Sequence, residues 1–67
     1  MTLTAVLTPD AEGGFVAHNP ETGTTTQGDT VDEALANLKE ATTLYLEEFS
    51  FELASPSLMT TFEVAHA

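Results

Sequence analysis

One amphipathic segment, which begins after Thr30, constrains the fold most. Apolar residues recur along it with the period of an α-helix, at Val31, Ala34, Leu35, Leu38, Ala41, Tyr45, Leu46 and Phe49. Thr30 is a good N-cap, and Glu33 follows at the spacing of a capping box. Pro56 disfavours helical geometry in the residue before it, so we expect the helix to end between Phe49 and Ala54. The apolar face of this helix needs a sheet to cover it.

Four short segments have the alternation or the β-branched composition of strands. They are residues 2–8, 15–18, 24–27 and 58–64. Proline and glycine punctuate the chain at 9–14 and 19–23, so we expect the first three strands to pair antiparallel through short turns. The fourth follows the helix, and a right-handed crossover would place it parallel to the first, in the order 3-2-1-4. The expected fold is an α+β domain over residues 1–67, β-β-β-α-β, with the helix on one face of a four-stranded sheet.

Two surfaces would remain uncovered in this fold. The sheet face away from the helix would carry Thr4, Val6 and Val16, where another molecule can dock. Leu44 and Phe51 project at about 200° to 220° from the first helical residue, on the acidic side of the helix, and form a candidate contact patch. Alternatively, Phe51 lies past the helix end and folds back into the core, and a single exposed Leu44 needs no explanation.

The chain is short and lacks cysteine. Its 67 residues have room for one domain, which buries only about 60% of the surface of the unfolded chain. With no cysteine there is no disulfide and no cysteine-based zinc site to support so small a core. We therefore expect support from self-association, and the protein is predicted to be a homo-oligomer. The absence of cysteine also fits a cytoplasmic location.

The charge balance excludes several classes of function. Eleven Asp and Glu residues stand against one basic residue, Lys39, which gives a formal net charge of −10. A surface that holds nucleic-acid phosphates or anionic lipids needs several Lys or Arg residues, so neither is an expected partner. No apolar run reaches the length of a membrane span, and the N-terminus lacks the features of a signal peptide. The acidity either keeps the protein soluble or steers it toward a basic protein.

The residues with reactive side chains do not form a catalytic pattern. His18 and His66 lack the spacing of metal ligands, and no serine has a histidine beside it. The first predicted strand contains no acid, which argues against a two-metal nuclease. The glycines fit turns better than a phosphate cradle. We expect no enzyme activity, no catalytic or metal-binding residue and no cofactor. His18 is either a plain surface residue or one that contacts a partner.

Five stretches resemble the HicB-like antitoxin family, the acidic half of a toxin–antitoxin pair. They are Leu7-Thr8-Pro9-Asp10, Glu12-Gly13-Gly14-Phe15-Val16-Ala17, Pro20-Glu21, Thr26-Gln27-Gly28-Asp29-Thr30 and Glu33-Ala34-Leu35-Ala36-Asn37-Leu38. The resemblance implies a partial ribonuclease H-like fold without nuclease activity. It also implies a partner, a small basic HicA-type toxin that cleaves messenger RNA and is neutralised by occlusion. A net charge of −10 suits such a partner.

The resemblance also suggests where the partner binds. It is concentrated at Glu12, Phe15, His18, Pro20 and Glu21, which we expect around one rim of the sheet as partner-binding residues, with Leu44 and Phe51 as an independent candidate patch.

Two departures from the family pattern refine this expectation. Thr22-Gly23-Thr24-Thr25 replaces the usual Leu-Pro-Gly-Cys-like turn, and the chain stops at Ala67 without the DNA-binding domain that many members carry. We therefore expect a stand-alone member with no direct DNA contact. The competing hypothesis is an oligomeric structural, regulatory or small-ligand-binding subunit that has no toxin partner.

Overall fold

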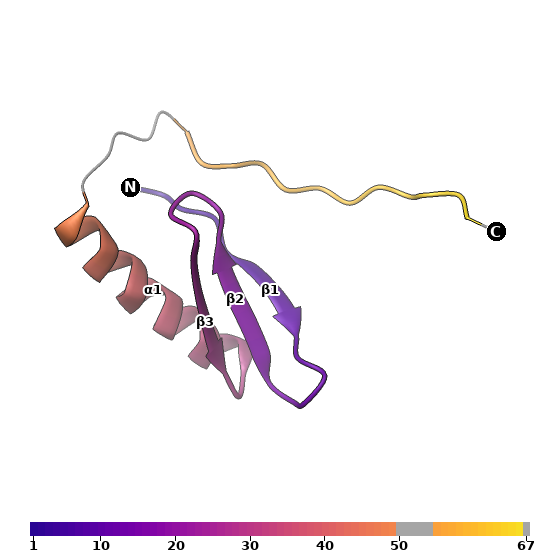
Figure 1. Cartoon of the computed structure of the whole chain (residues 1–67), viewed down its shortest axis with the longest axis horizontal. Coiled ribbons are helices and arrows are strands. Elements are labelled where there is room, and N and C mark those ends of the chain that lie inside the picture. The colour runs from indigo at the N-terminus through magenta and orange to yellow at the C-terminus, as the bar shows by residue number, and fades with distance from the viewer. Residues whose placement is uncertain (50–54, 67) are drawn as a thin grey trace.

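The computed structural model describes residues 1–49 and 55–66. It contains three strands and one helix, in the order β1 (Val6–Pro9), β2 (Phe15–Asn19), β3 (Thr24–Gly28) and α1 (Val31–Glu48). The strands form one antiparallel sheet in the order β1-β2-β3, and α1 packs against β3 and β2 (Figure 1). The predicted α+β class, with three antiparallel strands followed by a helix, is confirmed.

Both turns depend on glycines with positive φ. In the first turn the N–H of Asp10 donates to the carbonyl of Gly14, and the N–H of Gly13 donates to the carbonyl of Asp10, each at 3.0 Å. Gly13 and Gly14 have φ values of 105° and 78°, which residues with a side chain rarely adopt. In the second turn Gly23, with φ of 79°, donates to the carbonyl of Asn19 at 2.8 Å. These turns fix the antiparallel pairing that the sequence predicts.

The helix begins where its N-cap predicts. The hydroxyl of Thr30 accepts a hydrogen bond of 3.1 Å from the N–H of Glu33, and Asp32 and Glu33 place negative charge in the first turn. The helix ends at Glu48, and the N–H of the C-cap residue Phe49 donates to the carbonyl of Tyr45. The helix therefore ends one residue before the predicted range of Phe49 to Ala54.

The buried core is small and lies between α1 and the middle of the sheet. Ala17, Ala34 and Leu38 are its buried apolar residues, with Ala5, Leu7 and Phe15 packed against them. The helix lies close to β3 because Gly28 has no side chain; a Cβ there would come within 2.8 Å of the Ala34 Cα. The hydroxyl of Thr26 also donates to the carbonyl of Ala34 at 3.0 Å. One end of the helix is thereby fixed to the sheet.

The face of α1 that the sheet covers is narrower than the sequence predicts. Val31, Leu35 and Phe49 were expected in the buried stripe, but they are 38%, 42% and 62% exposed. Thr42 is buried instead, in line with Ala34 and Leu38. Thr42 tolerates burial because its hydroxyl donates to the carbonyl of Leu38 at 2.9 Å. Three strands are too few to cover the whole apolar stripe.

The predicted fourth strand at 58–64 is not part of the sheet in this structure. Residues 55–66, which we call the C-terminal arm, lie fully outside the sheet and are all exposed (Figure 1). The radius of gyration, 13.7 Å, exceeds the roughly 11 Å of a compact chain of this length. One physical reason is that β1 offers only four residues as a partner and ends at Pro9, which has no N–H to donate.

Candidate functional site

Four residues join three separate segments of the chain, and we call them the clip: Thr4, Asn19, Glu21 and Ser57. Asn19 is only 1% exposed; its side-chain amide donates to the carbonyl of Thr4 at 2.7 Å and to Glu21 Oε1 at 2.6 Å. Glu21 Oε1 also accepts from the N–H of Thr4 at 2.7 Å, while Oε2 accepts from the N–H of Ser57 at 2.7 Å. The Thr4 hydroxyl donates to the carbonyl of Ser57 at 3.1 Å. The clip thus holds the N-terminal segment and the root of the arm against the β2–β3 turn.

The clip favours the ionised form of its carboxyl group. The N–H of Thr4, above all, holds the pKa of Glu21 well below its usual range. Burial opposes this shift less strongly, and the N–H of Ser57 lowers the pKa further. The Asn19 carbonyl oxygen is also satisfied, since it accepts from the N–H of Thr22 at 2.8 Å. The side-chain amide of Asn19 and both carboxylate oxygens of Glu21 therefore have hydrogen-bond partners within the chain.

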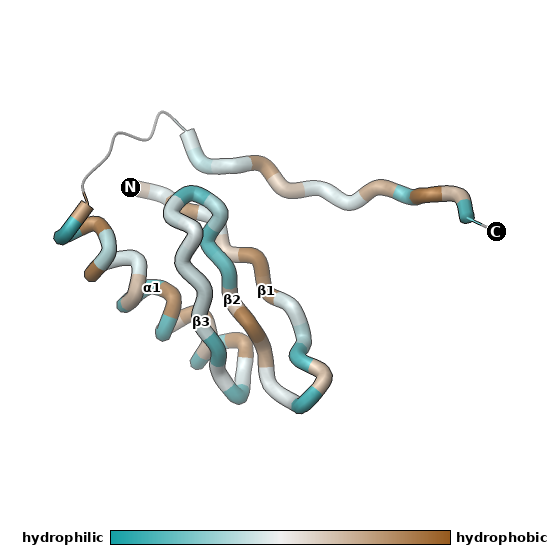
Figure 2. The backbone as a smooth tube through the Cα atoms, in the orientation of Figure 1, coloured by the Kyte–Doolittle hydropathy of each residue, from teal (hydrophilic) through white to brown (hydrophobic). Residues whose placement is uncertain are grey.

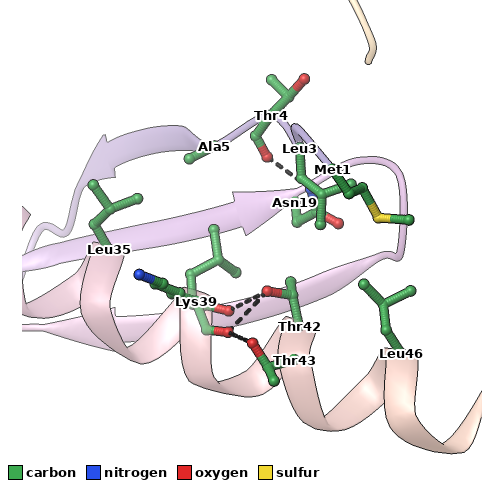
Figure 3. Close-up of a pocket in the computed structure, with 11 residues that line it drawn as sticks. Met1, Leu3, Thr4, Ala5, Asn19, Leu35, Lys39, Thr42, Thr43 and Leu46 are labelled. Carbon is green, nitrogen blue, oxygen red and sulfur yellow. Dashed lines mark hydrogen bonds between the residues drawn. The ribbon is translucent and has the colours of Figure 1, made fainter. Parts of the chain in front are cut away.

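A pocket of about 500 Å³ lies between the N-terminal segment and α1 (Figure 3). We call it the N-terminal pocket. It is lined by Met1, Leu3, Thr4, Ala5, Asn19, Leu35, Leu38, Lys39, Thr42, Thr43 and Leu46. This lining is mostly apolar, contains no carboxylate and includes the only basic residue of the chain, Lys39.

The pocket exists because the sheet stops at β1. Helix α1 lies over β3 and β2, so the flank of the helix that carries Leu35 and Leu46 extends beyond the sheet. Opposite this flank, Figure 3 shows Leu3 and Ala5 in the segment that leads into β1. The outer edge of β1 has no strand beside it in the described part of the chain. The pocket is therefore the unfilled apolar space beside the edge of the sheet.

The five residues expected around one rim are distributed over the molecule. Glu12 is exposed in the β1–β2 turn, whereas Pro20 and Glu21 lie in the β2–β3 turn, at the opposite end of β2 (Figure 1). Phe15 is half-buried and packs against the core. His18 lies on the sheet face away from the helix, with its Nδ1 2.8 Å from Thr25 Oγ1. The five residues do not share one rim, because Glu12 lies before β2 and Pro20 and Glu21 lie after it, at opposite ends of the strand.

The structure describes one of the two residues of the independent candidate patch. Leu44 is 57% exposed, and Phe51 lies outside the described residues. Glu40, Glu47 and Glu48 are also exposed, and at four, three and four residues from Leu44 they share its side of the helix. An exposed apolar side chain thus stands among three carboxylates, and we call these four residues the helix patch.

Sequence reasoning missed Asn19 in the clip and Lys39 in the N-terminal pocket. Asn19 appeared only as a turn residue, because its burial depends on contacts with Thr4, fifteen residues away. Lys39 appeared only as a term in the charge balance. The signal for Lys39 was its position one residue after Leu38 on the apolar side of the helix, where a lysine stem can line an apolar wall and keep its ammonium group in water.

Two further features, a metal-binding cluster and a membrane-spanning helix, are absent from the described part of the chain. Residues 1–49 and 55–66 contain no group of three or more His, Cys, Asp or Glu side chains placed to hold a metal ion. Within the same ranges, no helix has both the length and the apolar character to cross a membrane.

Comparison with known proteins assigns the chain to a family. A family described as a family of unknown function (DUF7387) matches residues 5–63, which include all three strands, the helix and most of the arm. No curated protein and no solved structure matches the chain. The chain belongs to the DUF7387 family.

Proposed function

We propose that this chain is a non-enzymatic protein-binding domain of the cytoplasm that covers and neutralises a small basic protein. The observation that carries the proposal is the helix patch, where Leu44 is 57% exposed among Glu40, Glu47 and Glu48. An apolar anchor surrounded by charges of one sign is typical of a protein contact, since the apolar group supplies affinity and the charges select and steer the partner. The partner that fits carries an apolar recess inside a positively charged surface.

The charge of the whole chain supports the same proposal. With a net charge of −10, the protein attracts a cationic protein over a distance of about one Debye length and repels nucleic acid. The resemblance to HicB-like antitoxins points to a partner of HicA type, a small basic toxin that cleaves messenger RNA. Binding would place carboxylates where RNA phosphates otherwise lie, so inhibition would occur by occlusion.

We also propose that residues 58–64 complete the sheet as its fourth strand, beside β1, which would give the ribonuclease H-like arrangement. Three observations support this. The outer edge of β1 is unpaired in the described chain, the adjacent N-terminal pocket is apolar, and the arm alternates Thr60, Phe62 and Val64 with Met59, Thr61 and Glu63. A strand in this position would cover the flank of α1 that three strands leave exposed.

The function is tested with the basic protein that the chain captures from its native cell, identified by mass spectrometry and purified. Glu47→Lys in the helix patch is compared with Glu12→Lys in the β1–β2 turn. Both change the net charge by the same amount, so long-range steering changes alike and only the location differs. We expect Glu47→Lys and Leu44→Asp to weaken binding and Glu12→Lys to have a much smaller effect.

Two outcomes would contradict the proposal. Equal effects of Glu47→Lys and Glu12→Lys would show that the helix patch is not the contact surface. Capture of no basic protein, or a captured protein whose RNA cleavage continues when this chain is added in excess, would exclude the neutralising role. RNA cleavage by the purified chain alone would contradict the proposal that the chain is not an enzyme.

A second function is favoured by a different observation, the N-terminal pocket. Its volume of about 500 Å³ lies in the range of small-molecule sites, and its apolar walls with one lysine suit an apolar anion. The chain would then be a small-ligand-binding or regulatory subunit without a toxin partner. A fatty-acid probe that binds with a Kd unaffected by Leu44→Asp but weakened by Leu35→Asp would favour this alternative.

A further inference from the structure

We infer that the N-terminal pocket receives the C-terminal arm of a second copy of this chain, so that two copies exchange arms. This inference rests on the proposed fourth strand and adds which molecule supplies it. It does not depend on the identity of the basic partner, because the helix patch and the N-terminal pocket share no residue.

The C-terminal arm exposes several large apolar side chains, as a segment that packs against another surface does. Leu58, Met59, Phe62 and Val64 are 100%, 65%, 84% and 68% exposed. Figure 2 shows several hydrophobic stretches along the extended segment that leads to the C-terminus, apart from the sheet and helix. Twelve residues thus expose four large apolar side chains, and such a concentration of exposed apolar surface marks a site of interaction. The arm therefore needs a covering surface, and the N-terminal pocket offers apolar walls.

The clip prevents the chain from using its own arm to fill its own pocket. It sets Thr4 beside Ser57 through a hydrogen bond of 3.1 Å. If the arm continued from there along its own β1, five residues further on Phe62 would lie beside Pro9, and Glu63 would lie beside Asp10. That register offers no N–H at Pro9 and sets two carboxylates together.

The same register places Leu58 beside Ala5, at the rim of the pocket, but does not bring Phe62 or Val64 into it. The pocket is lined on its N-terminal side by Met1, Leu3, Thr4 and Ala5, whereas Phe62 would lie beside Pro9 at the end of β1 and Val64 past it. A second copy is not subject to this restriction, because its arm is anchored on its own clip. Only an arm from another molecule can place Phe62 and Val64 between Leu3 and the α1 flank. This favours exchange between copies over closure within one chain.

Charge favours the same pair of surfaces. Two copies with a net charge of −10 each repel one another, so contact between them is least costly where carboxylates are fewest. The lining of the pocket contains no carboxylate and contains Lys39, and the arm carries a single carboxylate, Glu63. The outer face of α1, in contrast, carries Glu40 and Glu47. The pocket and the arm are thus complementary in charge as well as in apolar character.

The test uses the natural absence of cysteine, which allows single cysteines to be introduced without background. A Val64→Cys chain is mixed with a Leu35→Cys chain under mild oxidation, and in parallel with a Leu44→Cys chain. Leu35 and Leu44 are similarly exposed, at 42% and 57%, on the same helix, but only Leu35 lines the pocket. We expect a disulfide-linked heterodimer with Leu35→Cys and little with Leu44→Cys. Equal yields in the two mixtures would overturn the inference.

The double variant Leu35→Cys/Val64→Cys at high dilution separates the two proposals. A disulfide within one chain, together with no cross-linking in the mixture of single variants, would support the fourth strand but overturn exchange between copies. No disulfide in either experiment would overturn the exchange of arms. Neither result would affect the helix patch, which is tested separately through Leu44 and Glu47.

A second measurement does not require cysteine. Sedimentation equilibrium of the unmodified chain should show a dimer. Phe62→Asp should weaken the dimer by at least about 100-fold, because two apolar side chains leave the reciprocal interface and two carboxylates enter it. Leu44→Asp adds the same charge at another exposed apolar position and should leave the dimer intact. A monomeric unmodified chain, or equal weakening by both substitutions, would contradict the exchange.

Discussion

The carboxylate of Glu21 accepts a hydrogen bond of 2.7 Å from the backbone N–H of Thr4, seventeen residues earlier in the chain. Its second oxygen accepts from Ser57, thirty-six residues later. A single side chain in the β2–β3 turn therefore connects the segment before β1 with the root of the arm. The resemblance placed Glu21 among the partner-binding residues, but its contacts within the chain give it a structural role first.

The first prediction concerns pH. The folded pKa of Glu21 is lowered, so its stabilising contribution is complete above the unfolded value of about 4.3 and is lost as the pH falls below it. Glu21→Gln removes this contribution at neutral pH. Urea unfolding should show the variant to be less stable than the unmodified chain at pH 7, with a smaller difference at pH 3. A difference that is constant with pH would show that the Glu21 charge does not stabilise the fold.

The second prediction concerns the contact between β3 and α1 at Gly28. A Cβ at this position would meet the backbone of Ala34, with the Cα at 2.8 Å, and neither backbone can move without separating the helix from the sheet. Gly28→Ala should cost about 3 kcal/mol, at the upper end for overpacking. Gly23→Ala meets no atom within 4 Å and should cost about 1–2 kcal/mol through its left-handed backbone alone. Equal losses in thermal unfolding would contradict the close contact.

The third prediction compares two leucines six residues apart on α1. Leu38 is 4% exposed in the core, whereas Leu44 is 57% exposed on the outer face. Leu38→Ala should lower the free energy of unfolding by about 2–5 kcal/mol, which is enough to unfold much of so small a domain. Leu44→Ala should change it by less than about 0.5 kcal/mol. Chemical denaturation measures both, and a large loss for Leu44→Ala would place that side chain in the core.

The fourth prediction concerns the start of the helix. The Thr30 hydroxyl accepts from the N–H of Glu33 at 3.1 Å, so Thr30→Ala should cost about 1 kcal/mol. Thr43 serves as a control, because its hydroxyl donates to the carbonyl of Lys39 on the exposed side of the helix and caps nothing. Thr43→Ala should have little effect on the midpoint of thermal unfolding. If the Thr30→Ala variant and the unmodified chain had the same midpoint of thermal unfolding, Thr30 would not stabilise the helix as its N-cap.

The elements set by local sequence could be predicted well. The N-cap at Thr30 and the turn glycines act through neighbours in the sequence, so pattern alone located the helix start and the second and third strands. The first strand was predicted at residues 2–8 but is formed by Val6–Pro9, so only its second half was located. The width of the buried helix stripe could not be predicted in this way. Leu35 has the right periodicity for burial but remains 42% exposed, because burial also depends on how many strands lie opposite.

The clip could not be predicted from the sequence. Asn19 and Glu21 have the composition of an ordinary turn, and their partners Thr4 and Ser57 are distant in the chain. The separation of Glu12 from Glu21 was also missed, since the resemblance suggested a shared rim, whereas β2 places the two residues at opposite ends of the sheet. The exposure of Leu44, in contrast, could be predicted, because helical geometry alone decides which way its side chain points.

The most direct test of the exchange of arms is nuclear magnetic resonance on a mixture of two differently labelled samples of the unmodified chain. One sample carries labelled leucine methyl groups and the other carries unlabelled aromatic rings in a deuterated background. We predict isotope-filtered contacts between the Phe62 ring of one copy and the Leu35 and Leu46 methyl groups of the other. The absence of contacts between copies, with the arm either free or folded onto its own chain, would contradict the exchange.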